Sequence, residues 1–129
     1  LGLGTALPTV DRGEMVVYGR NVRTRLAMSR AVTSKEICEA LTPVVDAIAR
    51  MTVSALEGAP PEIAADVYAL GLVLSGGSAL LPGFAEALSR KTGLRVIPAR
   101  DPLDCVAFGL GRILEQPRLW GEPLEYRYR

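Results

Sequence analysis

Two short apolar runs near the middle of the chain, residues 72–75 and 94–98, constrain the fold more than any other feature. Both are too short for an amphipathic pattern, and the first is apolar on both faces, as expected of a strand inside a covered parallel sheet. Helical spacing precedes, separates and follows the two runs. The sequence therefore predicts an α/β layer with a parallel strand pair and a right-handed crossover.

Four helices are expected around these strands. The longest follows a capping-box pair, Thr33 and Glu36, and carries apolar residues at helical spacing as far as Gly58. A short helix over residues 60–70 ends before Gly71, and another over residues 81–92 is closed by Gly93. The last helix extends to Gln116, with Asp101 as its cap and Pro102 at its first position.

A β-hairpin is predicted at the start of the chain. Residues 14–32 form two β-rich runs, with Gly19, Arg20 and Asn21 as the turn signal between them. Two short central strands cannot make a sheet alone, because typical sheets have about four to six strands. Neighbouring strands should come from upstream sequence, and a start at Leu1 without a methionine suggests a fragment.

Composition excludes several classes of function. Hydrophobic residues make up 49% of the 129 positions, enough for a core, and 15 basic against 14 acidic residues give no basic stripe for nucleic acid. The absence of histidine removes imidazole bases and histidine metal sites. Cys38 and Cys105 are expected as buried reduced thiols, with a disulfide or metal site as the alternative. No signal peptide or membrane-spanning run is visible.

The most interesting candidate site is the glycine pair in LVLSGGSALLPG, at the predicted carboxyl end of the first strand. Ligands of open α/β sheets collect at that edge, and glycine lets a flat or anionic group approach the backbone. A glycine turn alone is structural more often than functional. Asp101, Asp104 and Glu115 are tempting carboxylates, but their places at a cap, a first turn and a helix end favour structural roles.

Several motifs in succession resemble the C-terminal part of the MreB family of bacterial actins, the rod shape-determining proteins. The chain has a PPE helix start, a strand ending in SGG, then LLPG, TGLRV and DPLDCVAFGLG, in the order and spacing of the family. The likeness covers roughly residues 1–116. It implies an actin-like fold of two RNase-H-like lobes, of which this α/β chain supplies the C-terminal portion of the second lobe.

The resemblance also implies a division of the chain. Residues 1–32 would end the small outer subdomain with the β-hairpin, residues 33–116 would form the latter half of the inner subdomain, and residues 117–129 an irregular tail. In the family, the glycine-rich turn contacts the adenosine part of ATP or ADP. Carried over by position, the contact residues are Gly76, Gly77, Ser78, Ala79 and Leu80. Ser78 stands where the family has its third glycine, and Ser75 where it usually has threonine.

The family's phosphate loops and the carboxylates that position magnesium and water are not recognisable in this sequence. Catalytic and metal-binding residues are therefore not expected here, and the fragment alone should neither hydrolyse nor bind nucleotide. The intact parent resembles an ATPase that uses ATP or ADP with magnesium.

The function implied is that of a nucleotide-dependent filament protein, cytoplasmic at the inner face of the membrane, which controls cell shape and organises cell-wall synthesis. Its partners would be further copies of itself and membrane proteins of cell elongation, with no nucleic acid and with membrane contact only through the missing lobe. The alternatives are part of a small-molecule kinase of the same superfold, such as a sugar or acetate kinase, and a scaffold relative that has lost hydrolysis.

Overall fold

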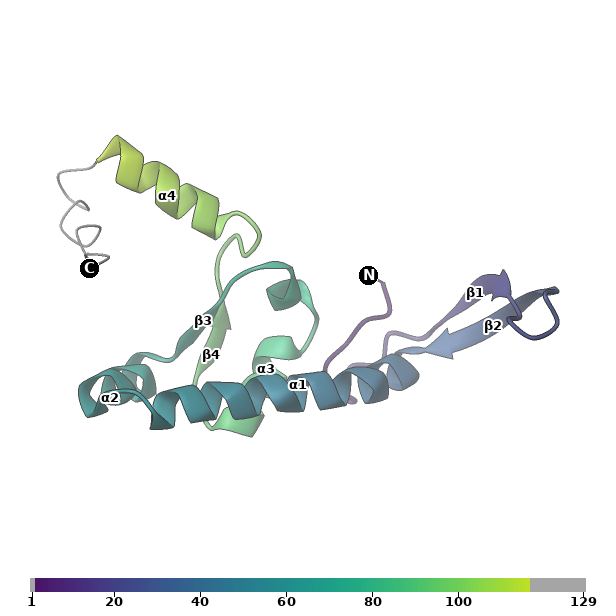
Figure 1. Ribbon diagram of the computed structural model, residues 1–129, viewed down its shortest axis with the longest axis horizontal. Coiled ribbons are helices and arrows are strands. Elements are labelled where there is room, and N and C mark those ends of the chain that lie inside the picture. Colours follow the sequence, from purple (N-terminus) through teal and green to yellow (C-terminus); the bar gives the residue numbers. More distant parts are fainter. Residues whose placement is uncertain (1, 117–129) are drawn as a thin grey trace.

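A computed structural model describes residues 2–116 of the chain. It places a hairpin at one end of a long helix and a small α/β unit along the rest of that helix (Figure 1). The α/β architecture with an N-terminal hairpin is as the sequence predicts. In chain order the elements are β1 (Glu14–Arg20), β2 (Ala27–Thr33), α1 (Ser34–Glu57), α2 (Pro61–Leu70), β3 (Leu72–Leu74), the 3-10 turn η1 (Gly77–Leu80), α3 (Phe84–Thr92), β4 (Val96–Pro98) and α4 (Cys105–Glu115).

The hairpin pairs β1 with β2 in antiparallel register, from Glu14 opposite Thr33 to Arg20 opposite Ala27. Its turn begins at Asn21, just after the position predicted. The Asn21 side-chain oxygen accepts hydrogen bonds from the N–H groups of Arg23 and Thr24, at 2.9 and 3.0 Å. This use of asparagine to hold a turn is a familiar local device. The prediction of a hairpin is confirmed.

Helix α1 begins with the predicted capping box. The Thr33 hydroxyl accepts a hydrogen bond from the Glu36 N–H at 3.2 Å, and the Glu36 carboxylate accepts one from the Thr33 N–H at 2.9 Å. Pro43 lies inside the helix and has no N–H to donate. Beside it, the Thr42 hydroxyl donates to the carbonyl of Cys38 at 2.9 Å. The helix nevertheless continues past Pro43 and spans 24 residues in all.

The two short strands form the predicted parallel pair, with Leu72 opposite Val96 and Leu74 opposite Pro98. Gly71, just before β3, has a φ of +90° and a ψ of −173°, a region that only glycine adopts readily. The core lies between α1, α3 and the strands, and the N-terminal segment closes it. Its buried members are Leu7, Val45, Ala49, Phe84, Ala87, Leu88, Leu94 and Val96.

Two helix starts differ from the sequence predictions. Helix α3 begins at Phe84 and not at Leu81, because Gly83 takes a left-handed φ of +76° that interrupts the helical path. Helix α4 begins at Cys105, so the prediction of Asp101 as its cap is wrong. The carbonyl of Pro102 accepts the N–H of Gly76 at 2.6 Å and so bonds to another segment of the chain and not to the next turn of the helix.

The two cysteines are both free thiols. Cys38 is buried in α1 as predicted, whereas Cys105 at the start of α4 is only partly buried. Its sulfur lies 3.5 Å from the carbonyl oxygen of Pro102. The difference arises because α4 stands apart from the core in this chain (Figure 1).

Large apolar side chains remain uncovered on α4 and on the strand pair. Val73 in β3 is 65% exposed, and Phe108 and Leu114 in α4 are 63% and 81% exposed. Within residues 2–116 the parallel sheet has only its two strands. That further strands of the sheet come from upstream sequence stays a prediction. No helix in the same range combines the length and hydrophobicity needed to cross a membrane.

Candidate functional site

The glycine turn lies at the carboxyl end of β3, as predicted. The chain leaves the strand through Ser75 and Gly76 and enters the 3-10 turn η1, which ends at Leu80. The Gly76 N–H donates to the carbonyl of Pro102, so the turn is tied to the segment that leaves β4. Because β3 and β4 are parallel neighbours, their carboxyl ends meet at one edge of the sheet.

The two central glycines are there for different reasons. Gly76 has a φ of +82° and a ψ of 176°, a conformation that side chains with a Cβ adopt at high cost. At Gly77 the φ is not positive, and a Cβ atom would lie 3.6 Å from Cδ2 of Leu103, an ordinary contact. The fold therefore requires glycine at position 76 but accepts a small side chain at position 77. A ligand that lies against the backbone would explain why position 77 has glycine although the fold does not require it.

The turn is accessible from solvent. Gly76, Gly77 and Ser78 are exposed, and Leu80 is 52% exposed. Of the five residues singled out from the sequence, Gly77, Ser78 and Leu80 line a hollow of about 280 Å³, together with Leu81 and Pro82. Gly76 and Ala79 belong to the same turn but do not line the hollow.

Sequence reasoning missed the contribution of two neighbouring segments. Leu81 and Pro82, which line the hollow, were assigned to a helix. Pro102 and Leu103 approach the turn from the other strand, as the hydrogen bond to Gly76 shows. The predicted parallel pair already indicates this neighbourhood, since residues that follow adjacent parallel strands lie near each other.

The turn offers backbone N–H groups, a hydroxyl and apolar side chains, but no charge. Among residues 2–116, neither the N–H of Gly77 nor that of Ser78 donates a hydrogen bond. In the same residues, no three cysteine or carboxylate side chains gather closely enough to hold a metal ion. Asp104 precedes α4, and its carboxylate accepts no capping hydrogen bond from the helix. The turn therefore presents an uncharged, partly polar surface, and no acidic or basic side chain of residues 2–116 lines its hollow.

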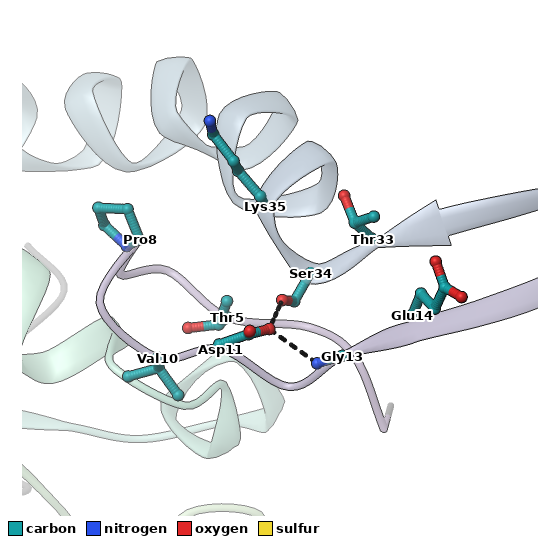
Figure 2. Close-up of a pocket in the computed structure, with 9 residues that line it drawn as sticks. All are labelled: Thr5, Pro8, Val10, Asp11, Gly13, Glu14, Thr33, Ser34 and Lys35. Atoms are coloured by element: carbon teal, nitrogen blue, oxygen red, sulfur yellow. Dashed lines mark hydrogen bonds between the residues drawn. The ribbon is translucent and has the colours of Figure 1, made fainter.

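A larger hollow, of about 480 Å³, lies where the hairpin joins α1 and not at the glycine turn. Figure 2 shows the Asp11 carboxylate pointing at both Gly13 and Ser34. One Asp11 oxygen accepts the N–H of Gly13 at 2.8 Å and the hydroxyl of Ser34 at 3.1 Å. The Ser34 oxygen in turn accepts the N–H of Arg12 at 3.2 Å. These bonds fasten the N-terminal segment to the start of α1.

Two carboxyl groups near this junction have altered acidity. The N–H of Gly13 and the hydroxyl of Ser34 stabilise the Asp11 carboxylate, which lowers its pKa below the usual value. The N–H of Thr33 and the guanidinium of Arg30 lower the pKa of Glu36 in the same way. Both groups are therefore ionised anchors of the hairpin at neutral pH, and neither is poised to donate or accept a catalytic proton.

Comparison with protein families places the chain among known relatives. The model of the MreB/Mbl protein family matches residues 1–121. The cell shape-determining protein MreB of Escherichia coli strain K12 is 39% identical over 122 residues, which cover 95% of this chain and 35% of that protein. The cell shape-determining protein Mbl of Bacillus subtilis strain 168 is 35% identical over 113 residues, covering 88% of this chain and 34% of the relative.

Solved structures agree with that match. The crystal structure of MreB5 of Spiroplasma citri bound to ADP superposes with a TM-score of 0.83 and 25% sequence identity. The match covers 98% of this chain and 37% of the MreB5 chain. The structure of the same protein bound to AMPPNP also has a TM-score of 0.83, with 26% sequence identity. That match covers 94% of this chain and 36% of the MreB5 chain. The chain thus spans about a third of the length of the proteins it matches.

Proposed function

The chain belongs to the MreB/Mbl family, and on that premise we propose that it is part of a nucleotide-dependent actin-like filament protein that controls cell shape. The match over residues 1–121 is the observation that carries this proposal. It favours the filament protein over the sugar or acetate kinase of the same superfold. Residues 1–32 would belong to the outer subdomain of the second lobe, residues 33–116 to the inner subdomain and residues 117–129, mostly outside the matched region, to a tail.

In this proposal the glycine turn forms the adenosine side of a nucleotide site. The exposed backbone of Gly76, Gly77 and Ser78, the unused N–H groups at the start of η1 and the apolar side chain of Leu80 fit a flat base and its ribose. The bound ADP and AMPPNP of the Spiroplasma proteins support this assignment. Ala79 would shape the turn without lining the hollow.

Hydrolysis would depend on residues outside this chain. ATP with magnesium would supply the chemistry of phosphoryl transfer, which needs metal ions and positioned groups around the γ-phosphate. The turn would contact only the adenosine part of the nucleotide, so its role would be to position the nucleotide. The intact protein would be the ATPase, and this chain one wall of its site.

The wider biology follows from the same premise. The protein would assemble with further copies of itself and lie in the cytoplasm at the inner face of the membrane. There the filament would organise cell-wall synthesis with membrane proteins of cell elongation. The names of the relatives, cell shape-determining proteins, support this placement.

A substitution at Gly77 tests the nucleotide role in the full-length protein. A Cβ atom at Gly77 would meet only the flexible end of Leu103, at 3.6 Å, so the fold should survive Gly77→Val. Because the added methyl groups occupy the face offered to the nucleotide, we expect ATP affinity measured by calorimetry to fall about tenfold, or about 1.4 kcal/mol. Gly19→Val, in the exposed hairpin where a Cβ meets nothing within 4 Å, is the matched control.

Sedimentation with ATP and with ADP tests the filament itself. Wild-type protein should pellet in a nucleotide-dependent manner, and Gly77→Val should pellet only at higher ATP concentration. Unchanged ATP affinity in Gly77→Val, with an unchanged thermal unfolding curve, would remove the turn from the nucleotide site. Absence of nucleotide-dependent pelleting, together with phosphorylation of a small substrate such as acetate, would favour the kinase.

A further inference from the structure

The hollow at the glycine turn has one polar side chain, the hydroxyl of Ser78. The other residues that line the hollow offer only backbone and apolar side chains: Gly77, Leu80, Leu81 and Pro82. Ser78 is exposed, so a ligand in the hollow can reach its hydroxyl without a rearrangement of the turn. A serine hydroxyl both donates and accepts hydrogen bonds, so it suits a ligand group with the same two capacities.

The Ser78 hydroxyl makes no hydrogen bond within residues 2–116. Other hydroxyls of the chain donate to the carbonyl four residues earlier, as those of Thr42, Thr52 and Thr92 do. Four residues before Ser78, the carbonyl of Leu74 already accepts the N–H of Ala99 at 2.8 Å. The hydroxyl therefore keeps its full hydrogen-bonding capacity for a ligand.

The backbone on both sides of Ser78 is held by the turn. The Ala79 N–H donates to the carbonyl of Gly76 at 3.1 Å, and the Leu81 N–H donates to the carbonyl of Ser78 at 3.0 Å. Only rotation about the Cα–Cβ bond of Ser78 remains to be fixed when a ligand binds. A group held in this way loses little conformational entropy on binding, so more of its hydrogen-bond energy appears as affinity.

The order of groups along the turn fits the order of groups in a nucleoside. The unused N–H groups and the Ser78 hydroxyl stand at the start of η1, and the apolar side chains from Leu80 to Pro82 follow. No charged side chain lines the hollow, so it suits a base and its ribose and not the phosphates. A base packed on the apolar side chains would bring its ribose to the hydroxyl.

We propose that the Ser78 hydroxyl bonds one of the ribose hydroxyls of the bound nucleotide and so selects ribonucleotides over analogues that lack that hydroxyl. This inference rests on the proposed nucleotide role of the turn and adds a specificity-determining side chain to it. Ser78 stands where the resemblance to the family places a glycine, which has no side chain for such a bond. A site built to bond a hydroxyl binds the analogue without it less tightly, because its own polar group is left unpaired.

Calorimetry of the full-length protein with ATP, 2′-deoxy-ATP and 3′-deoxy-ATP tests the bond. Ser78→Ala should lower the affinity for ATP about three- to tenfold, the effect expected from one hydrogen bond. The same substitution should leave unchanged the affinity for the one analogue that lacks the bonded hydroxyl, since that bond is already absent. Ser29→Ala, at an exposed serine of the hairpin, is the matched control and should bind all three nucleotides like the wild type.

The outcomes separate this inference from the function on which it rests. Wild-type protein that binds neither ATP nor ADP refutes the nucleotide role of the turn. Wild-type affinity for ATP in Ser78→Ala, together with a loss in Gly77→Val, refutes the Ser78 bond alone. An equal loss for ATP and both deoxy analogues in Ser78→Ala also overturns the bond to ribose. Disturbed folding would produce that equal loss, so the comparison of analogues distinguishes it from the proposed bond.

Discussion

Among the glycines of residues 2–116, Gly71 should be the most sensitive to substitution. A Cβ atom at this position would lie 2.5 Å from the carbonyl oxygen of Arg95, far inside contact distance, and the φ of +90° is unsuited to alanine. The unfavourable backbone conformation costs about 1–3 kcal/mol, and the shift needed to relieve the overlap costs about 1–3 kcal/mol more. Gly71→Ala should therefore lower the free energy of unfolding by roughly 2–6 kcal/mol.

The consequence of that substitution should be specific to the strand pair. The same Arg95 oxygen, just before β4, accepts the N–H of Leu72 at 2.7 Å and so joins the starts of the two strands. Urea denaturation of the full-length protein, followed by circular dichroism, measures the loss. Gly19→Ala is the control, because a Cβ there meets nothing within 4 Å. A Gly71→Ala protein within about 0.5 kcal/mol of wild type would refute the steric reasoning.

Two further predictions concern the junction of the hairpin with α1. Thr33→Ala removes the hydroxyl that accepts the Glu36 N–H, and should lower the free energy of unfolding measured by urea denaturation by about 1 kcal/mol. Thr33→Ser keeps a capping hydroxyl and should retain most of that stability. Equal losses of stability in the two variants would contradict a capping role. Hydrogen bonds from the Gly13 N–H and the Ser34 hydroxyl lower the pKa of Asp11 in the folded protein. The ionised Asp11 side chain therefore contributes its full stabilisation above the pKa of the unfolded chain, about 4. This stabilisation disappears as the pH falls through the lower pKa of the folded protein. Asp11→Asn should therefore lose less stability between pH 6 and pH 3 than wild type, and parallel losses in the two proteins would exclude this anchor.

Local signals in the sequence predicted most of the secondary structure. Thr33 and Glu36 form a capping box in the structure as their spacing indicates, and the runs around Leu72 and Val96 pair in parallel. The start of α4 was missed because its cause is a tertiary contact. The Pro102 carbonyl bonds to Gly76, 26 positions earlier, and no pattern near Asp101 reports that bond.

The candidate site was located from the sequence, but its composition was not. The order of strand and helix placed the glycine turn at the correct edge of the sheet, because edge and strand direction follow from topology. Which glycine the backbone needs could not be predicted, since the two look alike in the sequence and only the structure shows that Gly76, and not Gly77, has a positive φ. The adenosine contact itself stays a prediction. The tail at residues 117–129 lies outside the described residues.

The length of α1 has a mechanical consequence. The helix packs in the core at Val45, and its first residue, Ser34, lies about 17 Å away at 1.5 Å per residue. The seven-residue strands continue beyond it for about 23 Å at 3.3 Å per residue (Figure 1). Together they form a lever of roughly 40 Å, so a tilt of about 5° where the helix meets the core displaces the hairpin turn by about 3.5 Å. A rotation that barely alters the packing around Val45 thus moves the far end by slightly more than the length of a hydrogen bond.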